Sequence, residues 1–123
     1  MKRFYCIILF YLFIGILPAN AVTYNFIDGL EDVPLMSGLT QHIDDTVSFG
    51  NEEARFIEVY LTSAKVGFKM VEKFYTESLP QLGWTYQGKE GNSLLFYREG
   101  EALNIHKEST KPLKIRITVK NRI

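Results

Sequence analysis

Cysteine is almost absent from this chain of 123 residues, whose single cysteine is Cys6. Residues 22–123 contain none, which excludes a disulfide framework, a thiolate nucleophile and a zinc-thiolate site from that part. A segment of about one hundred residues without disulfides depends on its own apolar core, and its length fits a single domain.

Charge is absent from the apolar run that surrounds Cys6. This run lies between Lys2-Arg3 and the small-x-small motif Ala19-Asn20-Ala21, which is typical of a signal peptidase site. Pro18 ends it short of the roughly 20 apolar residues that a spanning helix needs. The pattern predicts a cleaved signal peptide over residues 1–21, export to the periplasm or secretion, and no transmembrane segment after signal removal.

Basic residues are absent from Val22 to Ala54, a segment that carries seven acidic ones: Asp28, Glu31, Asp32, Asp44, Asp45, Glu52 and Glu53. The end of the chain reverses this balance, with Lys107, Lys111, Lys114, Arg116, Lys120 and Arg122 against Glu108. Residues 22–51 are also rich in glycine, aspartate and threonine, a composition that indicates an extended, loop-rich acidic lead-in. The opposite charges predict that this lead-in folds over the basic side of the last strand.

Histidine is scarce, and the two residues present, His42 and His106, show no spacing typical of a metal site. Glycine-rich phosphate loops and the Gly-x-Ser-x-Gly motif of serine hydrolases are also missing. We therefore assign no catalytic residue and no metal ligand, and expect no cofactor. The alternative kept open is a small metal-dependent or hydrolytic enzyme that uses His42, Asp44, Asp45 and His106.

The rest of the sequence has clear periodicity. Arg55 to Leu61 alternates as a strand does, and Thr62 and Ser63 are good caps for a helix from Ala64 to about Leu79. On that helix, Val66, Met70, Phe74 and Ser78 form the expected buried stripe, with Val71, Tyr75 and Leu82 beside it. Pro80 and Gly83 end it, and strands follow near 84–87, 94–98, 102–107 and 113–120. The predicted fold is α+β, one main helix packed on a curved antiparallel sheet, in a single domain over residues 52–123.

The last strand has the clearest pattern, because Leu113, Ile115, Ile117 and Val119 alternate with polar and basic residues. One face of its sheet therefore packs on the core, and the other meets solvent or a partner. We predict a binding surface on that second face, made of Phe56, Tyr60, Lys114, Arg116 and Lys120. The basic strand lacks the interleaved aromatic residues of RNA-binding surfaces, and with export predicted, nucleic acid is not an expected partner.

Three stretches of the chain carry a resemblance to a known group of proteins. They are DVPLMSGL (32–39), FYTESLPQLGW (74–84) and FYREGEALNI (96–105). They resemble small exported proteins of alphaproteobacteria of the rickettsial type, which often have proline where this chain has Ser37. The resemblance implies an envelope setting and a compact strand-helix-meander domain, and it implies no catalytic residue.

These observations favour a non-enzymatic role in the periplasm or at the envelope. The expected partner is an envelope protein or an anionic envelope component. An accessory role in assembly or stability, without a ligand of its own, is the other non-enzymatic possibility.

Overall fold

The computed structural model describes residues 24–51 and 53–122 of the chain. Residues 1–21, with the predicted cleavage site at Ala19 and Ala21, lie outside the described residues, and so does Cys6. Within the described ranges, no helix is both long enough and apolar enough to cross a membrane.

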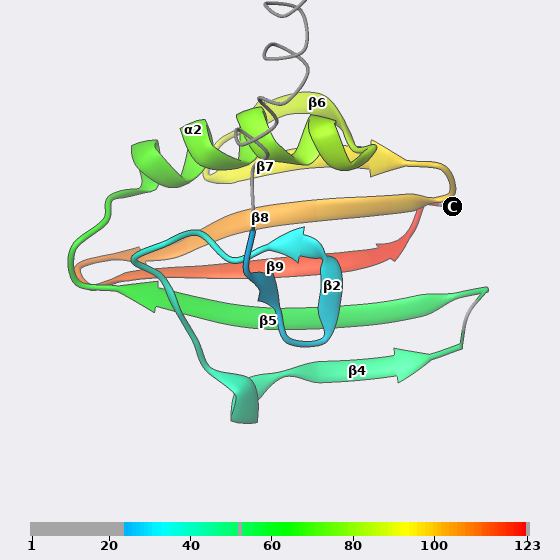
Figure 1. Ribbon diagram of the computed structural model, residues 1–123, viewed down its shortest axis with the longest axis horizontal. Helices are drawn as coiled ribbons and strands as arrows, with labels where there is room; N and C mark the ends of the chain where they lie inside the picture. The colour runs from blue at the N-terminus through cyan, green and yellow to red at the C-terminus, as the bar shows by residue number, and fades with distance from the viewer. Residues whose placement is uncertain (1–23, 52, 123) are drawn as a thin grey trace, which may run out of the picture.

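One antiparallel sheet of seven strands organises the described domain (Figure 1). The strand order is β3-β5-β9-β8-β7-β6. Strand β4 also pairs with β5, along residues 55–58, whereas the short β3 pairs with residues 61–62 of the same strand. The strands are β3 (Thr40–Gln41), β4 (Val47–Gly50), β5 (Arg55–Ser63), β6 (Thr85–Glu90), β7 (Ser93–Arg98), β8 (Glu101–Thr110) and β9 (Leu113–Asn121). Because β9 lies between β5 and β8, the meander after the helix closes back on the strand before it. The predicted α+β fold, with one helix on an antiparallel sheet, is confirmed.

The single α-helix of the described residues, α2 (Phe68–Ser78), lies across one face of the sheet (Figure 1). We call this covered side the inner face. Val71 and Tyr75 are fully buried on it, and the helix continues to the fully buried Leu79. The prediction that Met70 belongs to the buried stripe is wrong, since that side chain is 57% exposed. Val71, Tyr75 and Leu79 form one continuous buried stripe on the helix. Rotating the helix about its axis to bury Met70 would turn this stripe away from the sheet.

The start of the helix also differs from the prediction. Thr62 belongs to strand β5, and Gly67 occupies the N-cap position without a side-chain hydrogen bond. The hydroxyl of Ser63 accepts from the amides of Lys65 and Val66 at 3.0 and 2.9 Å. Ser63 therefore stabilises the turn that leaves the strand, and the helix begins four residues after the predicted Ala64.

The end of the helix follows the prediction closely. The 3-10 turn η3 (Leu79–Leu82) begins with Pro80 in its first turn, and Gly83 closes it with a left-handed φ of 96°. Trp84, 2% exposed, then leads into β6. The motif FYTESLPQLGW is thus a helix-to-strand corner.

The N-terminal part of the described chain forms strands where we expected an extended, loop-rich lead-in. The hairpin of β1 (Phe26–Ile27) and β2 (Leu30–Pro34) places the fully buried Ile27, Leu30 and Val33 in the same core as α2. The Tyr75 hydroxyl donates to the Pro34 carbonyl at 2.7 Å, and its burial raises the pKa of this phenol. The hairpin and α2 therefore cover the inner face together.

This placement shows that the predicted screening of the basic strand is wrong. Asp32, in the hairpin, pairs with Arg55 and Arg98 near one end of the inner face. Arg116, on the other side of the sheet, pairs with Glu108 of the neighbouring strand. The apolar residues Leu30 and Val33 direct the lead-in to the core, and this outweighs the attraction between exposed charges.

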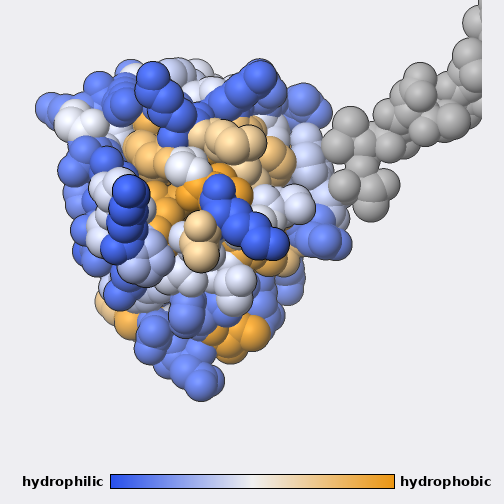
Figure 2. All heavy atoms as spheres, turned by 90° about the vertical axis from the view of Figure 1, so that its left-hand side faces the viewer, coloured by the Kyte–Doolittle hydropathy of each residue, from blue (hydrophilic) through white to orange (hydrophobic). Residues whose placement is uncertain are grey.

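The opposite end of the core is closed by α2 itself. Phe68, at the start of the helix, packs against the core, and Lys89 and Lys107 lie 5.9 and 5.8 Å from its ring centre. Figure 2, viewed from the end of the molecule where the β5–α2 connection lies, shows apolar atoms bordered by hydrophilic ones. Lysine side chains thus cover part of this apolar end.

Candidate binding face

The side of the sheet opposite α2 carries a continuous set of polar, aromatic and basic side chains. We call it the outer face. It belongs to the alternate residues of strands whose other residues form the core. Its members are Phe56, Glu58, Tyr60 and Thr62 of β5; Lys114, Arg116, Thr118 and Lys120 of β9; Ala102, Asn104 and His106 of β8; and Ser93, Leu95 and Tyr97 of β7. Since α2 and the β1–β2 hairpin pack on the inner face, no described helix or hairpin covers this one.

The outer face is hollowed above β7, β8 and β9. The hollow has a volume of about 400 Å³ and is lined by Ser93, Leu95, Ala102, Asn104, His106, Arg116, Thr118 and Lys120. The small side chains of Ser93 and Ala102 leave this space between longer neighbours. His106 Nδ1 and Ser93 Oγ are 2.8 Å apart, so the imidazole is held against the floor of the hollow. The hollow thus offers hydrogen-bonding and cationic groups together.

Two basic residues of the outer face, Lys114 and Arg116, contact side chains of neighbouring strands. Lys114 Nζ lies 5.1 Å from the ring centre of Tyr60, and Arg116 Nη1 lies 2.6 Å from Glu108 Oε2. The Tyr60 hydroxyl donates to Glu58 at 2.6 Å, and this bond raises the pKa of the tyrosine. Because these contacts limit side-chain motion, a partner would lose less conformational entropy on binding.

The structure places all five residues of the predicted binding surface on the outer face. Tyr60 is the register partner of Arg116, and Lys114 reaches its ring. Phe56 lies further along β5, where it stacks on Phe49 of β4 with ring centres 5.0 Å apart. The surface therefore has a basic part over β9 and an aromatic part toward β4. Its role in binding stays a prediction.

The structure does not bring all four residues of the alternative enzyme hypothesis together. His42, Asp44 and Asp45 line one hollow, and His106 lies elsewhere. His42 follows β3 and lies 2.7 Å, Nε2 to Oγ1, from Thr62, whereas His106 lies on β8. Strands β5 and β9 separate these two positions, and adjacent strands are about 4.8 Å apart. Asp44 and Asp45 lie in the exposed 3-10 turn η2 (Ile43–Asp45). Across residues 24–51 and 53–122, no three side chains of His, Cys, Asp or Glu gather as a metal ion would require.

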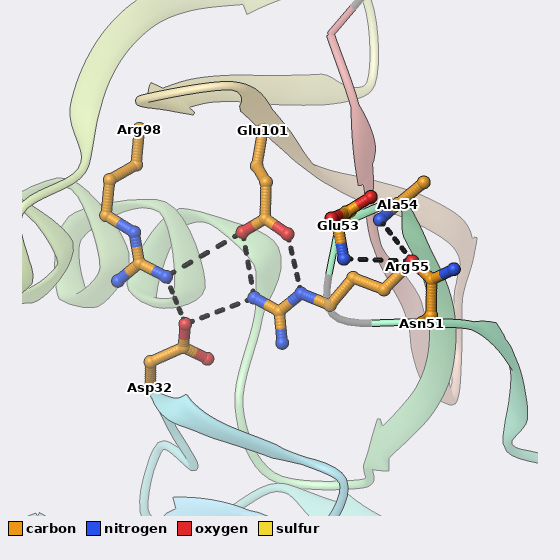
Figure 3. A network of polar contacts seen from close by, with 7 residues as sticks. All are labelled: Asp32, Asn51, Glu53, Ala54, Arg55, Arg98 and Glu101. Atoms are coloured by element: carbon orange, nitrogen blue, oxygen red, sulfur yellow. Dashed lines mark hydrogen bonds and ion pairs between the residues drawn. The ribbon is translucent and has the colours of Figure 1, made fainter.

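A second polar cluster lies near one end of the inner face (Figure 3). Arg55 binds Glu101 through two contacts, Nε to Oε2 at 2.6 Å and Nη2 to Oε1 at 2.9 Å. Arg55 Nη2 also lies 3.3 Å from Asp32 Oδ2, the oxygen that Arg98 Nη2 contacts. The guanidinium of Arg98 stacks 4.2 Å from the Trp84 ring centre. The cluster links the hairpin, β5 and the β7–β8 turn.

The electrostatics of this cluster favour a structural role. Burial alone would raise the pKa of Asp32, but the hydrogen bond and charge of Arg98, with the charge of Arg55, hold it below its ordinary value. The hydrogen bond to Glu101 raises the pKa of Arg55, so the charged forms of Asp32 and Arg55 are both favoured. An acid catalyst near neutral pH needs a carboxyl whose pKa is raised, so Asp32 lacks the property that general-acid chemistry requires.

Comparisons with protein-family models, with curated proteins and with solved structures find no match to this chain. Function is therefore inferred from geometry.

Proposed function

We propose that this protein is an exported, non-enzymatic binding domain that holds an acidic protein partner on its outer face. The observation that carries the proposal is the basic, aromatic and polar face of the seven-stranded sheet, which the described elements leave uncovered. Export rests on the apolar run and the Ala19-Asn20-Ala21 motif of the sequence.

The chemistry of the outer face favours a protein over a lipid surface. Arginine and aromatic side chains are enriched at protein interfaces, and here they alternate with carboxylates at fixed positions. Glu58 and Glu108 lie among the basic groups, and a uniformly anionic membrane would repel them. A protein surface can place acidic groups against Lys114 and Lys120 and donors against the two carboxylates.

The test combines a charge-reversal variant with a matched control. Lys114→Glu with Lys120→Glu reverses two charges on the outer face, and Lys69→Glu with Lys73→Glu makes the same change on exposed positions of α2. A photo-crosslinking residue at Thr118 then reports what lies on the outer face in cells. We expect one defined protein adduct, lost in the outer-face variant and kept in the α2 variant.

Three outcomes would contradict the proposal. An adduct equally abundant in both charge variants would show that the basic residues do not select the partner. A crosslinker at Lys73 that captures the same protein would show contact without selectivity for the outer face. Binding of the purified protein to vesicles of anionic lipid, with no protein adduct, would assign the face to membranes.

A further inference from the structure

Strand β4 has one backbone edge that pairs with no other strand among residues 24–51 and 53–122. Its only partner is β5, and it forms the lower edge of the sheet in Figure 1. All four residues, Val47 to Gly50, are exposed. The inner-face core therefore does not extend under this strand.

The hydrogen-bond register shows which backbone groups of β4 face outward. The Asn51 amide donates to the Ala54 carbonyl at 3.2 Å, which makes these two residues a hydrogen-bonded pair. Such pairs alternate along an antiparallel ladder, so Val47 and Phe49 bond to β5. The N–H and C=O groups of Ser48 and Gly50 then point away from the sheet.

The turn after β4 fixes this geometry. The side-chain carbonyl of Asn51 accepts from the amides of Glu53 and Ala54, each at 2.9 Å (Figure 3). Gly50 has a φ of 107°, and a Cβ there would lie 2.2 Å from the Ala54 carbonyl oxygen. These contacts of Gly50 and Asn51 thus constrain the end of β4.

The two edges of the sheet differ in how they are protected from pairing. Free edges of soluble proteins usually carry lysine, proline or a bulge. The opposite edge, β6, has Lys89 and a register shift between Tyr86 and Gly88. By contrast, β4 reads Val-Ser-Phe-Gly, and Val47 and Phe49 are 42% and 63% exposed. Figure 2 shows apolar atoms in the lower part of the molecule, above a hydrophilic tip.

We propose that β4 docks an extended segment of a partner protein by strand addition, and that this segment alternates apolar with basic residues. The proposal goes beyond the outer-face function, because it assigns a second surface with a partner of opposite charge. Strand addition would satisfy the outward amide and carbonyl of Ser48 and Gly50. The apolar residues of the segment would lie beside Val47 and Phe49.

Charge complementarity supports the basic residues of this segment. Asp44 and Asp45 lie just before β4, and Glu53 lies just after it. A second copy of β4, paired antiparallel, would bring these acidic ends together, so the charges disfavour self-pairing. A segment with lysine or arginine meets the opposite charge at both ends.

A hollow beside β4 gives the basic side chains a place. Its volume is about 940 Å³, and its lining includes Ser48, Gly50, Glu53 and Glu99. Arg55 and Glu101 also line it, and because these two are paired with each other, Glu53 and Glu99 are the carboxylates left for a basic side chain. The side chain of Ser48 lies on the opposite side of β4 from those of Val47 and Phe49, because side chains alternate along a strand. A docked strand would therefore direct one set of its side chains to the side of β4 that carries Ser48 and the other set to the side that carries Val47 and Phe49.

Synthetic peptides test the proposal without altering the protein. The probe is a short, fluorescently labelled peptide of alternating lysine and valine, titrated by anisotropy. Its matched control has the same side chains but a methyl group on every second backbone nitrogen, on the edge that would face β4. We expect the control to bind about tenfold more weakly or worse, since several backbone hydrogen bonds are lost. Amide exchange should slow at Ser48 and Gly50 when the unmethylated peptide binds.

Other results would overturn the proposal. Equal binding of the methylated and unmethylated peptides, or no binding of either, would exclude strand addition. If the peptide slows amide exchange along β6, docking belongs to the other edge. If exchange at Ser48 of the protein alone slows as the protein concentration rises, the edge pairs with a second copy of the chain. A glutamate-valine peptide that binds as tightly as the lysine-valine peptide would exclude the charge selectivity.

The two proposals can fail separately. The outer-face variant Lys114→Glu with Lys120→Glu should bind the lysine-valine peptide with unchanged affinity. Glu53→Gln with Glu99→Gln should weaken that peptide several-fold and leave the outer-face adduct intact. A reversed pattern would assign the peptide to the outer face and overturn the docking proposal.

Discussion

Arg55 and Glu101 form a two-bond ion pair across 46 positions of sequence, with Nε–Oε2 at 2.6 Å and Nη2–Oε1 at 2.9 Å. The first residue begins β5 and the second begins β8, and β9 lies between these strands. Their side chains are 27% and 21% exposed. The pair therefore bridges over a strand, and it does so partly shielded from water.

Because Arg55 and Glu101 are partly shielded from water, we expect their ion pair to add more to the free energy of unfolding than a solvent-exposed ion pair does. A double-mutant cycle of Arg55→Ala and Glu101→Ala should give a coupling free energy of unfolding of about 1–3 kcal/mol, because the two-bond geometry is partly buried. The matched control is Arg116 with Glu108, whose side chains are 36% and 26% exposed and whose single contact is 2.6 Å. Exposed pairs contribute roughly 0.2–1 kcal/mol.

Urea unfolding of both cycles measures the difference. Equal coupling energies in the two cycles would show that the cluster of Figure 3 is no more than a set of surface charges. The Asp32 contact to Arg55 also makes the cycle sensitive to a third partner. Repeating it in Asp32→Asn separates that contribution.

The lowered pKa of Asp32 predicts acid sensitivity. A carboxyl whose pKa is lower in the folded state stabilises the fold above its unfolded pKa, and this stabilisation is lost as the pH falls through the folded pKa. The loss therefore begins as the pH approaches the ordinary pKa of an aspartate from above, and it is complete below the lowered pKa of the folded state. Asp32→Asn should therefore lower the melting temperature near neutral pH and flatten its decrease toward acid.

Thermal unfolding at a series of pH values measures this effect. Asp45→Asn is the control, since it removes one carboxylate from the exposed turn η2. If Asp32→Asn keeps the full acid dependence of the parent protein, the guanidinium groups of Arg55 and Arg98 do not stabilise the ionised carboxylate.

Local signals in the sequence predicted the parts of the fold that they determine. The alternation of Leu113 to Lys120 gave the last strand and its two faces, and Pro80 with Gly83 gave the end of the helix. Met70 was misplaced because two overlapping apolar stripes run along α2, and the sequence does not show which one continues into the core. The hairpin β1–β2 was missed because its strands have only two and five residues and are joined through Asp28-Gly29, which indicates a turn without showing the strands beside it.

The candidate sites were harder to predict than the fold. The outer-face residues of β5 and β9 followed from alternation, whereas the hollow over β7, β8 and β9 depends on the pairing of β8 with both of its neighbours. The same alternation in residues 94–98 and 102–107 would have placed Leu95, Asn104 and His106 on that face. The Arg55–Glu101 pair had no local signal, because its members are brought together only by the strand order.

The left-handed backbone at Gly83 gives the last prediction, a stability difference between two glycines. Gly83→Ala should destabilise the protein by about 1–2 kcal/mol, because an L-residue is strained at a φ of 96°. Its new Cβ would also lie 3.3 Å from Cδ of Arg98, the residue that stacks on Trp84. The control is Gly67→Ala, where φ is −96° and no atom lies within 4 Å of the new Cβ. Urea unfolding should place Gly67→Ala slightly below the parent protein, because alanine is a poorer N-cap than glycine, and Gly83→Ala clearly below both. Equal stabilities of the two variants would mean that the corner does not require a left-handed residue.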